Sequence, residues 1–394
     1  MPEVIEASPS APRPQSARAL REVGLYFLRL GFTAFGGPAA HIAMMQAEVV
    51  DRRGWLRREE FLDLLGAANL IPGPSSTELA IFIGYRRAGF LGLLLAGLCF
   101  ILPAASITFV FAWAYVRFGA LPQVAAVLFG IKPVIIAVVV QALWTLGRTA
   151  LKSGALAGLA VLAAAASFFG MNALAVLLFS GILALAPRRL AGKSAVPGAF
   201  APGLAGLPHA TFAIAGTAAA TSLTGLFLVF FKVGAVLYGS GYVLLAFLRA
   251  DLVDCLHWLT ESQLLDAIAI GQFTPGPVFT TATFIGYVVQ GPAGALLATL
   301  GIFLPSFLLV AASGPLVRRL RQSPAAGAFL DGVNVAALAL MATVTWQFGR
   351  SAIVDFPTAA AAVVSAILLV RLRVNSFWLI LAGALLGIGK WWLA

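Results

Sequence analysis

Long uninterrupted runs of apolar residues set the pattern of this chain. No charged residue occurs from Phe90 to Val116 or from Gly291 to Val317, and only Lys132 interrupts the run from Leu121 to Leu146. A helix needs roughly 20 consecutive apolar residues to cross the hydrocarbon core of a bilayer. The pattern therefore predicts an all-α polytopic membrane protein.

Composition strengthens that prediction. Hydrophobic residues make up 61% of the 394 positions and charged residues only 10%, which is more apolar surface than a soluble domain could bury. The lipid bilayer is therefore the expected surrounding. Residues 1–19 differ, because they are rich in Pro, Ser, Ala and Arg and lack an apolar core. They are predicted to form a flexible cytoplasmic tail, with no cleaved secretory signal.

The basic residues have a specific distribution. A net charge of +11 would suggest nucleic acid as the partner of a soluble protein, but here Lys and Arg cluster in short connections between apolar runs. In such connections they set the orientation of a membrane protein, so no nucleic-acid partner is expected. Cys99 and Cys255 form neither a metal-ligand spacing nor a disulfide framework, and we expect no metal and no cofactor.

The sequence also contains an internal repeat. A shift of 203 residues places Gly31 on Gly234, Asp63 on Asp266 and Pro72-Gly73-Pro74 on Pro275-Gly276-Pro277. After a one-residue deletion a shift of 202 continues the match, ending with Gly147-Arg148 on Gly349-Arg350. We interpret residues 20–191 and 221–394 as two homologous halves, joined by a Gly-, Pro- and Ala-rich linker at residues 192–220.

Equivalent loops of the two halves differ in charge. The first loop of the N-terminal half is basic around Arg52 and Arg53, whereas its counterpart in the C-terminal half carries Asp251 and Asp254. By the positive-inside rule these loops face opposite sides of the membrane, as in transporters built from inverted repeats with a site between them. A second basic loop at Arg86-Arg87 indicates that the segment before it is re-entrant.

The number of crossings stays open. The apolar stretch at residues 154–187 could form one helix or two short ones, and the linker could add a partial crossing. We expect about ten to twelve membrane-embedded segments, with broken or re-entrant helices among them.

Two kinds of helix break recur in both halves. The first is a glycine cluster inside an apolar segment, which must be buried in protein or line a polar cavity because lipid cannot satisfy its exposed backbone groups. Close packing of helices at small residues is the alternative. The candidate site residues at this break are Gly36 and Gly37 in the first half and Gly239 and Ser240 in the second.

The second break is Pro-Gly-Pro, followed directly by hydroxyl residues. Two prolines remove two amide donors, and the second proline suits the first position of a new helix. Free amides and the positive end of the half-helix dipole would then form an anion site; a simple packing kink is the alternative. The candidate residues are Pro72, Gly73, Pro74 and Ser75 in one half and Pro275, Gly276, Pro277 and Thr280 in the other.

Several ionisable residues interrupt the apolar segments. Arg29 and Lys232 occupy matched positions before the glycine breaks and could attract an anion or extend to the membrane interface. Glu78 and His41 are candidates for proton coupling, although each could also be structural. Lys132 has a structural explanation if it pairs with a carboxylate such as that of Asp331.

Taken in order, these motifs resemble the chromate transporter family in its long, two-half form. The likeness covers nearly the whole chain. It rests on Phe35-Gly36-Gly37-Pro38 with His41, on Trp55, on Pro72-Gly73-Pro74 and Gly84, and on the segments Gly239-Ser240-Gly241 and Thr274–Tyr287. Gly-Ser-Gly departs from the family's run of three glycines. The resemblance implies a transporter that expels chromate from the bacterial cytoplasm, in the inner membrane.

Other functions remain to be weighed. Sulfate or another oxyanion shares the shape and charge of chromate, and an anion channel could use the same helix breaks. An enzyme is not expected, because the chain has no metal-ligand cluster, no Ser/His/Asp set and no nucleotide-binding loop. The sequence leaves the coupling ion and a possible homo-oligomer open.

Overall fold

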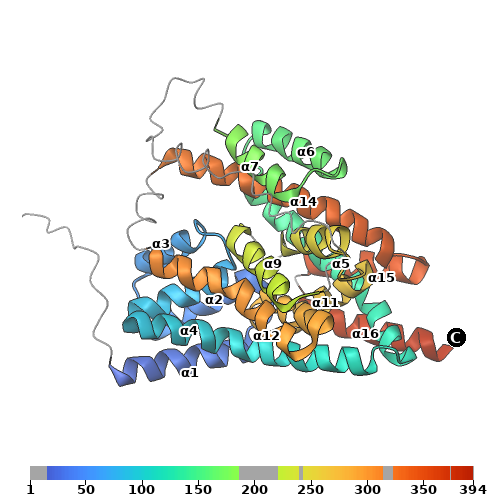
Figure 1. The fold of residues 1–394 in the computed structure, drawn as a ribbon, viewed down its shortest axis with the longest axis horizontal. Coiled ribbons are helices and arrows are strands. Elements are labelled where there is room, and N and C mark those ends of the chain that lie inside the picture. The colour runs from blue at the N-terminus through green and yellow to red at the C-terminus, as the bar shows by residue number, and fades with distance from the viewer. Residues whose placement is uncertain (1–15, 186–220, 239–242, 314–322, 373, 394) are drawn as a thin grey trace, which may run out of the picture.

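The computed structural model describes residues 16–185, 221–238, 243–313, 323–372 and 374–393, which form helices joined by short connections, without a strand. The elements follow one another in the same order in both halves (Figure 1). The first half contains α1 (Ala17–Thr33), α2 (Gly37–Gln46), the π-helix η1 (Ala47–Arg52), α3 (Arg58–Ala68), α4 (Ser75–Phe118), α5 (Pro122–Ala150), α6 (Gly154–Phe168) and α7 (Ala173–Leu183). The second contains α9 (Leu223–Val236), α10 (Leu244–Leu248), the π-helix η3 (Arg249–Cys255), α11 (Glu261–Phe273), the 3-10 turn η4 (Val278–Thr280), α12 (Thr281–Ala312), α14 (Pro324–Ala352), α15 (Phe356–Arg371) and α16 (Ser376–Leu393).

Four helices in the described part of the chain are long and apolar enough to cross a membrane. They are two matched pairs, α4 with α12 and α5 with α14. Five shorter apolar helices accompany them: α6, α7, α9, α15 and most of α16. The structure thus agrees with an all-helical membrane protein, while the expected ten to twelve embedded segments stay a prediction.

The two longest helices, α4 and α12, each double back on themselves. In α4 the backbone leaves helical geometry at Ala88 and Gly89, and the φ angle of Gly89 is 64°. A Cβ on Gly84 would lie 2.3 Å from the carbonyl oxygen of Gly92. Residues eight apart in a straight helix are separated by roughly 12 Å along the axis, so this contact requires a reversal of the chain. Gly291 makes the matching turn in α12.

The turn between α3 and α4 brings the two basic loops of the first half to the same end of the molecule. The guanidinium groups of Arg53 and Arg87 both lie 5.2 Å from the ring of Trp55. The chain between these loops, through α3 and the first part of α4, therefore leaves this end and returns to it. That is the geometry expected of a re-entrant segment.

The long helices α5 and α14 pack against short helices of the other half, whereas α4 and α12 pack against α1 and α9 of their own half. In the second half, α15 and α16 lie on α5, whereas α6 and α7 of the first half lie on α14. The pairs α4 with α12 and α5 with α14 join the halves directly. Figure 1 shows α6, α7 and α14 together at the edge opposite to α1. The halves are therefore interleaved, although the repeat is contiguous in sequence.

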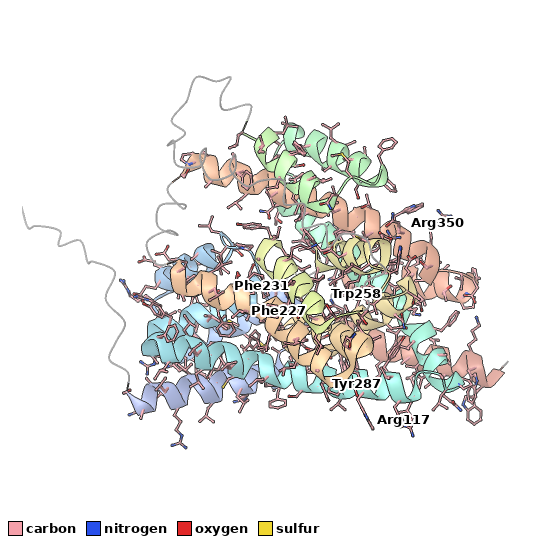
Figure 2. The ribbon with its side chains drawn as sticks, viewed as in Figure 1. Arg117, Phe227, Phe231, Trp258, Tyr287 and Arg350 are labelled. Atoms are coloured by element: carbon pink, nitrogen blue, oxygen red, sulfur yellow. The ribbon has the colours of Figure 1, made fainter. Side chains whose placement is uncertain are left out.

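Charged side chains project from the outside of this bundle. Arg117 at the end of α4 and Arg350 at the end of α14 extend from its periphery (Figure 2). Both are exposed. Such positions suit cations that sit at the boundary between lipid and water.

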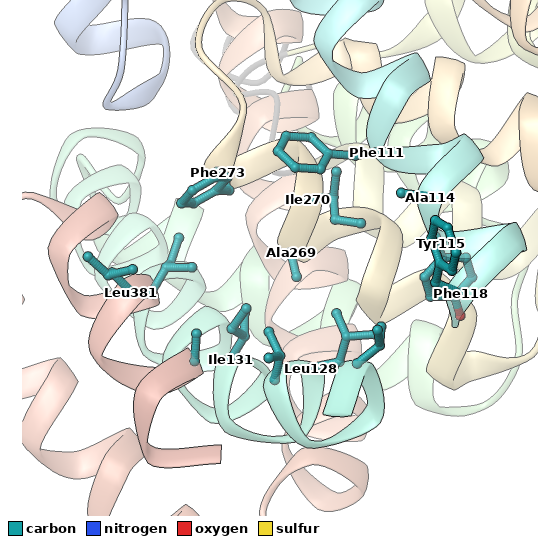
Figure 3. Close-up of a pocket in the computed structure, with 14 residues that line it drawn as sticks. Phe111, Ala114, Tyr115, Phe118, Leu128, Ile131, Ala269, Ile270, Phe273 and Leu381 are labelled. Atoms are coloured by element: carbon teal, nitrogen blue, oxygen red, sulfur yellow. The ribbon is translucent and has the colours of Figure 1, made fainter. Parts of the chain in front are cut away.

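One cavity of about 330 Å³ lies among α4, α5, α11 and α16 (Figure 3). Its walls are apolar and include Phe111, Tyr115, Ile131, Phe273 and Leu381. A second cavity, of about 480 Å³, lies between α5 and α14. No residue of either Pro-Gly-Pro break lines these two cavities.

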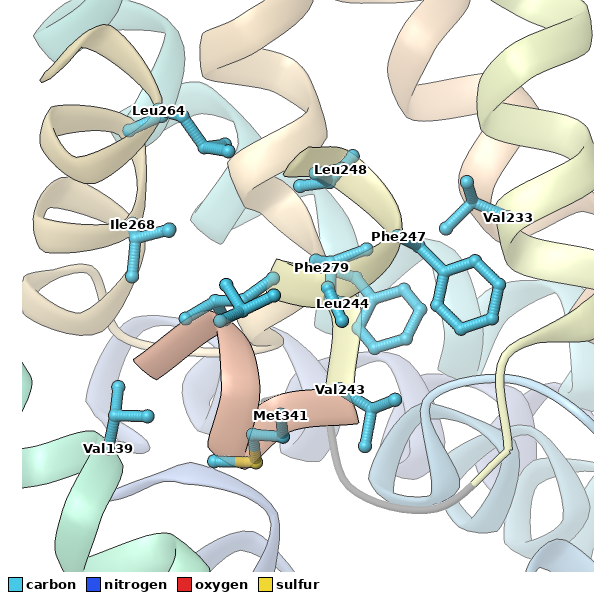
Figure 4. Packing of buried hydrophobic residues seen from close by; sticks show 14 of the residues in the cluster. Val139, Val233, Val243, Leu244, Phe247, Leu248, Leu264, Ile268, Phe279 and Met341 are labelled. Carbon is cyan, nitrogen blue, oxygen red and sulfur yellow. The ribbon is translucent and has the colours of Figure 1, made fainter. Parts of the chain in front are cut away.

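The larger hydrophobic core joins elements of both halves. Phe279, two residues after the second Pro-Gly-Pro break, lies beside Leu244 and Phe247 of the short helix α10 (Figure 4). Met341 of α14 and Val139 of α5 belong to the same cluster. A smaller core in the first half includes Phe27, Phe61 and Phe100. Because buried aliphatic and aromatic groups pack around the helix breaks, the residues at these breaks are held in fixed positions.

Lys132 has a partner other than the one expected. Its ammonium group lies 3.0 Å from Asp266 Oδ1 and donates to the Ser262 hydroxyl at 2.8 Å. Asp331 pairs with Lys152 instead, at 2.7 Å. The expected pairing of Lys132 with a carboxylate is confirmed, but Asp331 is the wrong partner, because α5 packs against α11 of the other half.

Candidate site at the paired helix breaks

The glycine cluster of the first half forms a left-handed turn between α1 and α2. Gly36 has a φ of 106° and Gly37 a φ of 77°, which a residue with a Cβ rarely adopts. Pro38 then occupies the first turn of α2, where a missing amide hydrogen costs nothing. The matching Gly239 and Ser240 lie outside the described residues.

Both Pro-Gly-Pro segments form tight turns between two helices. Pro72, Gly73 and Pro74 connect α3 to α4, and Pro275, Gly276 and Pro277 connect α11 to η4 and α12. The central glycines have φ values of 136° and 89°. The prediction of a helix broken at these two positions is therefore confirmed.

Each of these turns is hydrogen-bonded to the other half. The Gly73 amide donates to the Leu237 carbonyl at 2.7 Å, and the Gly276 amide donates to the Ala34 carbonyl at 2.8 Å. Leu237 and Ala34 are themselves matched in the repeat and end α9 and α1. The Pro-Gly-Pro turn of one half thus meets the C-terminal end of α1 or α9 in the other.

These bonds change how an anion could be held. The amides of Gly73 and Gly276 already have acceptors, so in this state they are not the free donors that the sequence suggested. The groups that remain are the hydroxyls and the N-terminal turn of each following helix. Ser75, the first residue of α4, is half-buried, and the next three residues are buried.

At the start of α4 two polar atoms are buried without a hydrogen-bond partner. They are Thr77 Oγ1 and Glu78 Oε2, and both residues are fully buried. The other oxygen of Glu78, Oε1, lies 3.5 Å from the Ser306 hydroxyl of α12 and fills the space where Gly73 would carry a Cβ. A buried polar group without a partner costs about 1–3 kcal/mol and is unusual.

The charge of Glu78 has no counter-ion in the described part of the chain. Burying an unpaired carboxylate costs several kcal/mol, whereas a helix N-terminus returns at most about 2 kcal/mol. The environment therefore accommodates the protonated, neutral acid.

In the second half, the side-chain hydroxyls that follow the Pro-Gly-Pro turn do have hydrogen-bond partners. Thr280, which matches Thr77, donates its hydroxyl to the Pro277 carbonyl and accepts from Thr108. Thr281, which matches Glu78, donates to the Val278 carbonyl. The two turns are therefore symmetric in backbone but different in chemistry, and the unsatisfied groups belong to the first half.

His41 supports the same junction. Its Nε2 lies 3.2 Å from the Ala34 carbonyl, which also accepts from Gly276, and its Nδ1 lies 3.4 Å from the Ser76 hydroxyl. The residue is fully buried, with its ring edge-on to Phe100. His41 thus links α2 to the start of α4.

The structure does not bring Arg29 and Lys232 to these turns. Arg29 is exposed on α1. Lys232 pairs with Asp251 of η3 at 2.7 Å. Sequence reasoning missed the cross-half pair of Lys132 and Asp266, whose carboxylate also accepts from the Tyr115 hydroxyl at 3.0 Å. The signal was a single charge inside an apolar run. Among the described residues, no three His, Cys, Asp or Glu side chains gather into a group that could hold a metal.

Comparisons with known proteins match most of the chain. A family model described as chromate transporter matches it twice, over residues 21–185 and 224–388. A chromate transport protein of Cupriavidus metallidurans is 33% identical over 372 residues, covering 93% of this chain and 92% of that protein. A probable chromate transport protein of Synechococcus elongatus is 33% identical over 345 residues, covering 87% and 88%. No solved structure matches.

Proposed function

This chain belongs to the chromate transporter family, and from that premise we propose that it exports chromate, or a similar tetrahedral oxyanion, from the bacterial cytoplasm. In this proposal it is a carrier in the inner membrane with its N-terminus in the cytoplasm and its two halves inverted. The opposed loop charges and the reciprocal bonds of Gly73 and Gly276 support the inversion.

One observation carries the choice of site: the buried, unpartnered hydroxyl of Thr77 in the first turn of α4. A tetrahedral dianion needs donors on several sides, and a helix N-terminus supplies amides and a positive dipole end. Ser75 and Thr77 add hydroxyl donors, and a neutral Glu78 adds a third. We place the oxyanion at the Pro72-Gly73-Pro74 turn, not at its counterpart, because Thr280 and Thr281 use their hydroxyls locally.

A carrier fits the geometry better than a channel. Neither cavity is lined by a residue of the two turns, and each turn is bonded to the opposite half. In this state the site is closed, as expected of one conformation in alternating access. Sulfate is the second candidate substrate, because hydroxyls and amides recognise shape and charge that both anions share.

Transport into everted membrane vesicles tests the proposal. Labelled chromate should accumulate, and unlabelled sulfate should compete if the site recognises both anions. Thr77→Val removes one hydrogen bond worth about 1 kcal/mol and should weaken chromate affinity roughly fivefold. Thr345→Val is the matched control, because this buried threonine of α14 donates to the Met341 carbonyl away from the turns. Absence of uptake by the unmodified protein would contradict the proposal.

A further inference from the structure

Glu78, Gly73 and Ser306 form a contact between the halves that we name the Gly73 joint. Glu78 belongs to α4, Ser306 to α12, and Gly73 to the turn that precedes α4. Glu78 Oε1 lies 3.5 Å from the Ser306 hydroxyl, and it stands where any side chain at position 73 would begin. The joint therefore connects the Pro72-Gly73-Pro74 turn of the first half to α12 of the second half.

The joint exists in one half only. The residues that match Glu78 and Ser306 are Thr281 and Ala104, neither of which can exchange a proton. Gly276 instead packs against Ala104, whose Cβ would lie 2.8 Å from a Cβ at position 276. Only the Pro72-Gly73-Pro74 turn therefore has an acid folded over it.

Two other titratable groups surround Glu78. The Tyr238 phenol follows α9 and lies close enough to interact electrostatically with the Glu78 carboxylate. His41 of α2 contacts the Ser76 hydroxyl, two residues before Glu78. From α12 the joint receives the uncharged Ser306. In the described part of the chain no Lys or Arg forms an ion pair with Glu78, so nothing on these elements neutralises a carboxylate there.

We propose that Glu78 is a proton-binding site whose protonated form closes the Gly73 joint, and that loss of the proton opens it. The neutral acid can remain between Gly73 and Ser306 without a counter-ion. The carboxylate formed by deprotonation must reach water or a cation, and both lie outside the buried contact. Glu78 then separates from Ser306, and the Pro72-Gly73-Pro74 turn is no longer held against α12.

This inference deepens the proposed function, because opening at this joint would expose the oxyanion site that we place at the same turn. It rests on that proposal only for the link to transport. The joint itself can be tested without any substrate, so a failure of one proposal is distinguishable from a failure of the other.

The test follows the accessibility of a cysteine at Thr77. Thr77→Cys is introduced into a protein that carries Cys99→Ala and Cys255→Ser, and its labelling by a small water-soluble maleimide is measured over a pH series. Each rate is divided by the rate in the same protein with Glu78→Gln, which remains neutral. This ratio removes the pH dependence of thiol reactivity that both proteins share. The neighbouring Glu78 carboxylate disfavours the thiolate, which would lower the ratio with pH, opposite to the expected rise. For a single proton we expect the ratio to approach one below the pH at which the exposed Glu78 carboxyl titrates. Above that pH the ratio should rise by about tenfold per pH unit.

Matched variants keep the result interpretable. Thr280→Cys reports on the equivalent turn of the second half, and its labelling ratio should stay constant with pH. Glu78→Met, a second neutral variant, replaces Glu78→Gln if that protein is not inserted. A ratio for Thr77→Cys that is the same at every pH would overturn the proposal and leave Glu78 a static structural acid. The rate in the Glu78→Gln protein is also divided by the rate in the same protein with His41→Asn added. If this second ratio depends on pH while the first does not, the proton site is His41 and the proposal is also wrong.

Discussion

The amide of Gly276 donates to the carbonyl of Ala34 at 2.8 Å, and this bond ties the Pro-Gly-Pro turn of one half to the glycine break of the other. Its counterpart from Gly73 to Leu237 has a length of 2.7 Å. The two halves therefore hold each other at the positions where both helices are interrupted. When one half moves against the other, these two hydrogen bonds must either break or move together with the residues that they join.

Gly276→Ala should strongly reduce transport. The glycine has a φ of 89°, and a Cβ there would lie 2.8 Å from that of Ala104 in α4. Strain in this region costs about 1–3 kcal/mol, and the clash adds to it. Gly54→Ala is the control, since Gly54 has a φ of 57° with nothing within 4 Å of its Cβ. Equal transport by both variants would show that close packing at position 276 is unimportant.

Gly73→Ala should have a different effect on the joint. Its Cβ would lie 2.2 Å from Glu78 Oε1 and 2.7 Å from the Ser306 hydroxyl, so the acid must move away. We expect reduced transport and faster maleimide labelling of Thr77→Cys even at low pH. Membrane insertion is checked by the amount of protein in the vesicles. Unchanged labelling would mean that Glu78 keeps its place despite the added methyl group.

Removal of one partner of Lys132 and Asp266 should destabilise the protein. This pair is largely buried, and an uncompensated charge at such a place costs about 3–5 kcal/mol. Asp266→Asn should therefore lower the unfolding temperature of the purified protein markedly. Asp331→Asn breaks the exposed pair with Lys152, which contributes at most about 1 kcal/mol, and should have little effect. Similar shifts for both variants would contradict a buried role for Lys132.

Cysteines at Arg53 and Asp254 should be labelled from opposite sides of the membrane. The two positions lie in equivalent loops with opposite charge character, and the inverted arrangement places them on different faces. A membrane-impermeant maleimide applied to right-side-out and everted vesicles distinguishes the faces. Labelling of both positions in the same vesicle preparation would exclude inversion.

Export should follow the membrane potential. Moving one charge across 100 mV is worth roughly 2.3 kcal/mol, so a dianion leaving an inside-negative cell gains about 4.6 kcal/mol. A tenfold concentration ratio corresponds to about 1.4 kcal/mol, so this gain supports an outward chromate concentration gradient of roughly three decades. In everted vesicles, valinomycin and potassium set the potential at equal pH, and chromate should accumulate in response. Accumulation that ignored the potential and followed only a pH gradient would require proton-coupled exchange instead.

Glu78→Gln provides a second measurement on the same vesicles. Because the potential acts on the charge of the anion, this variant should reach the same final level of chromate. It should do so more slowly, since its neutral side chain keeps the Gly73 joint closed, and its rate should lose the pH dependence seen with Glu78. Chromate itself takes up a proton near neutral pH, so the two profiles are compared at each pH. A final level of chromate that no longer followed the potential, in a normally inserted variant, would assign Glu78 the main driving role.

The sequence by itself determined the local features of this protein. Apolar runs predict helices, and Pro72-Gly73-Pro74 predicts a break, because hydrophobic length and missing amide donors act within a few residues. The repeat also follows from sequence, since matched positions such as Gly31 and Gly234 need no knowledge of packing.

Only the tertiary structure decided which groups meet. It gave the amide of Gly73 an acceptor in Leu237, folded Glu78 over Gly73 toward Ser306, and left Arg29 exposed on α1. These outcomes depend on how the halves interleave, with helices separated by more than a hundred residues in contact. A short polar group can bond to any partner that packing brings within reach, and sequence spacing does not record that choice.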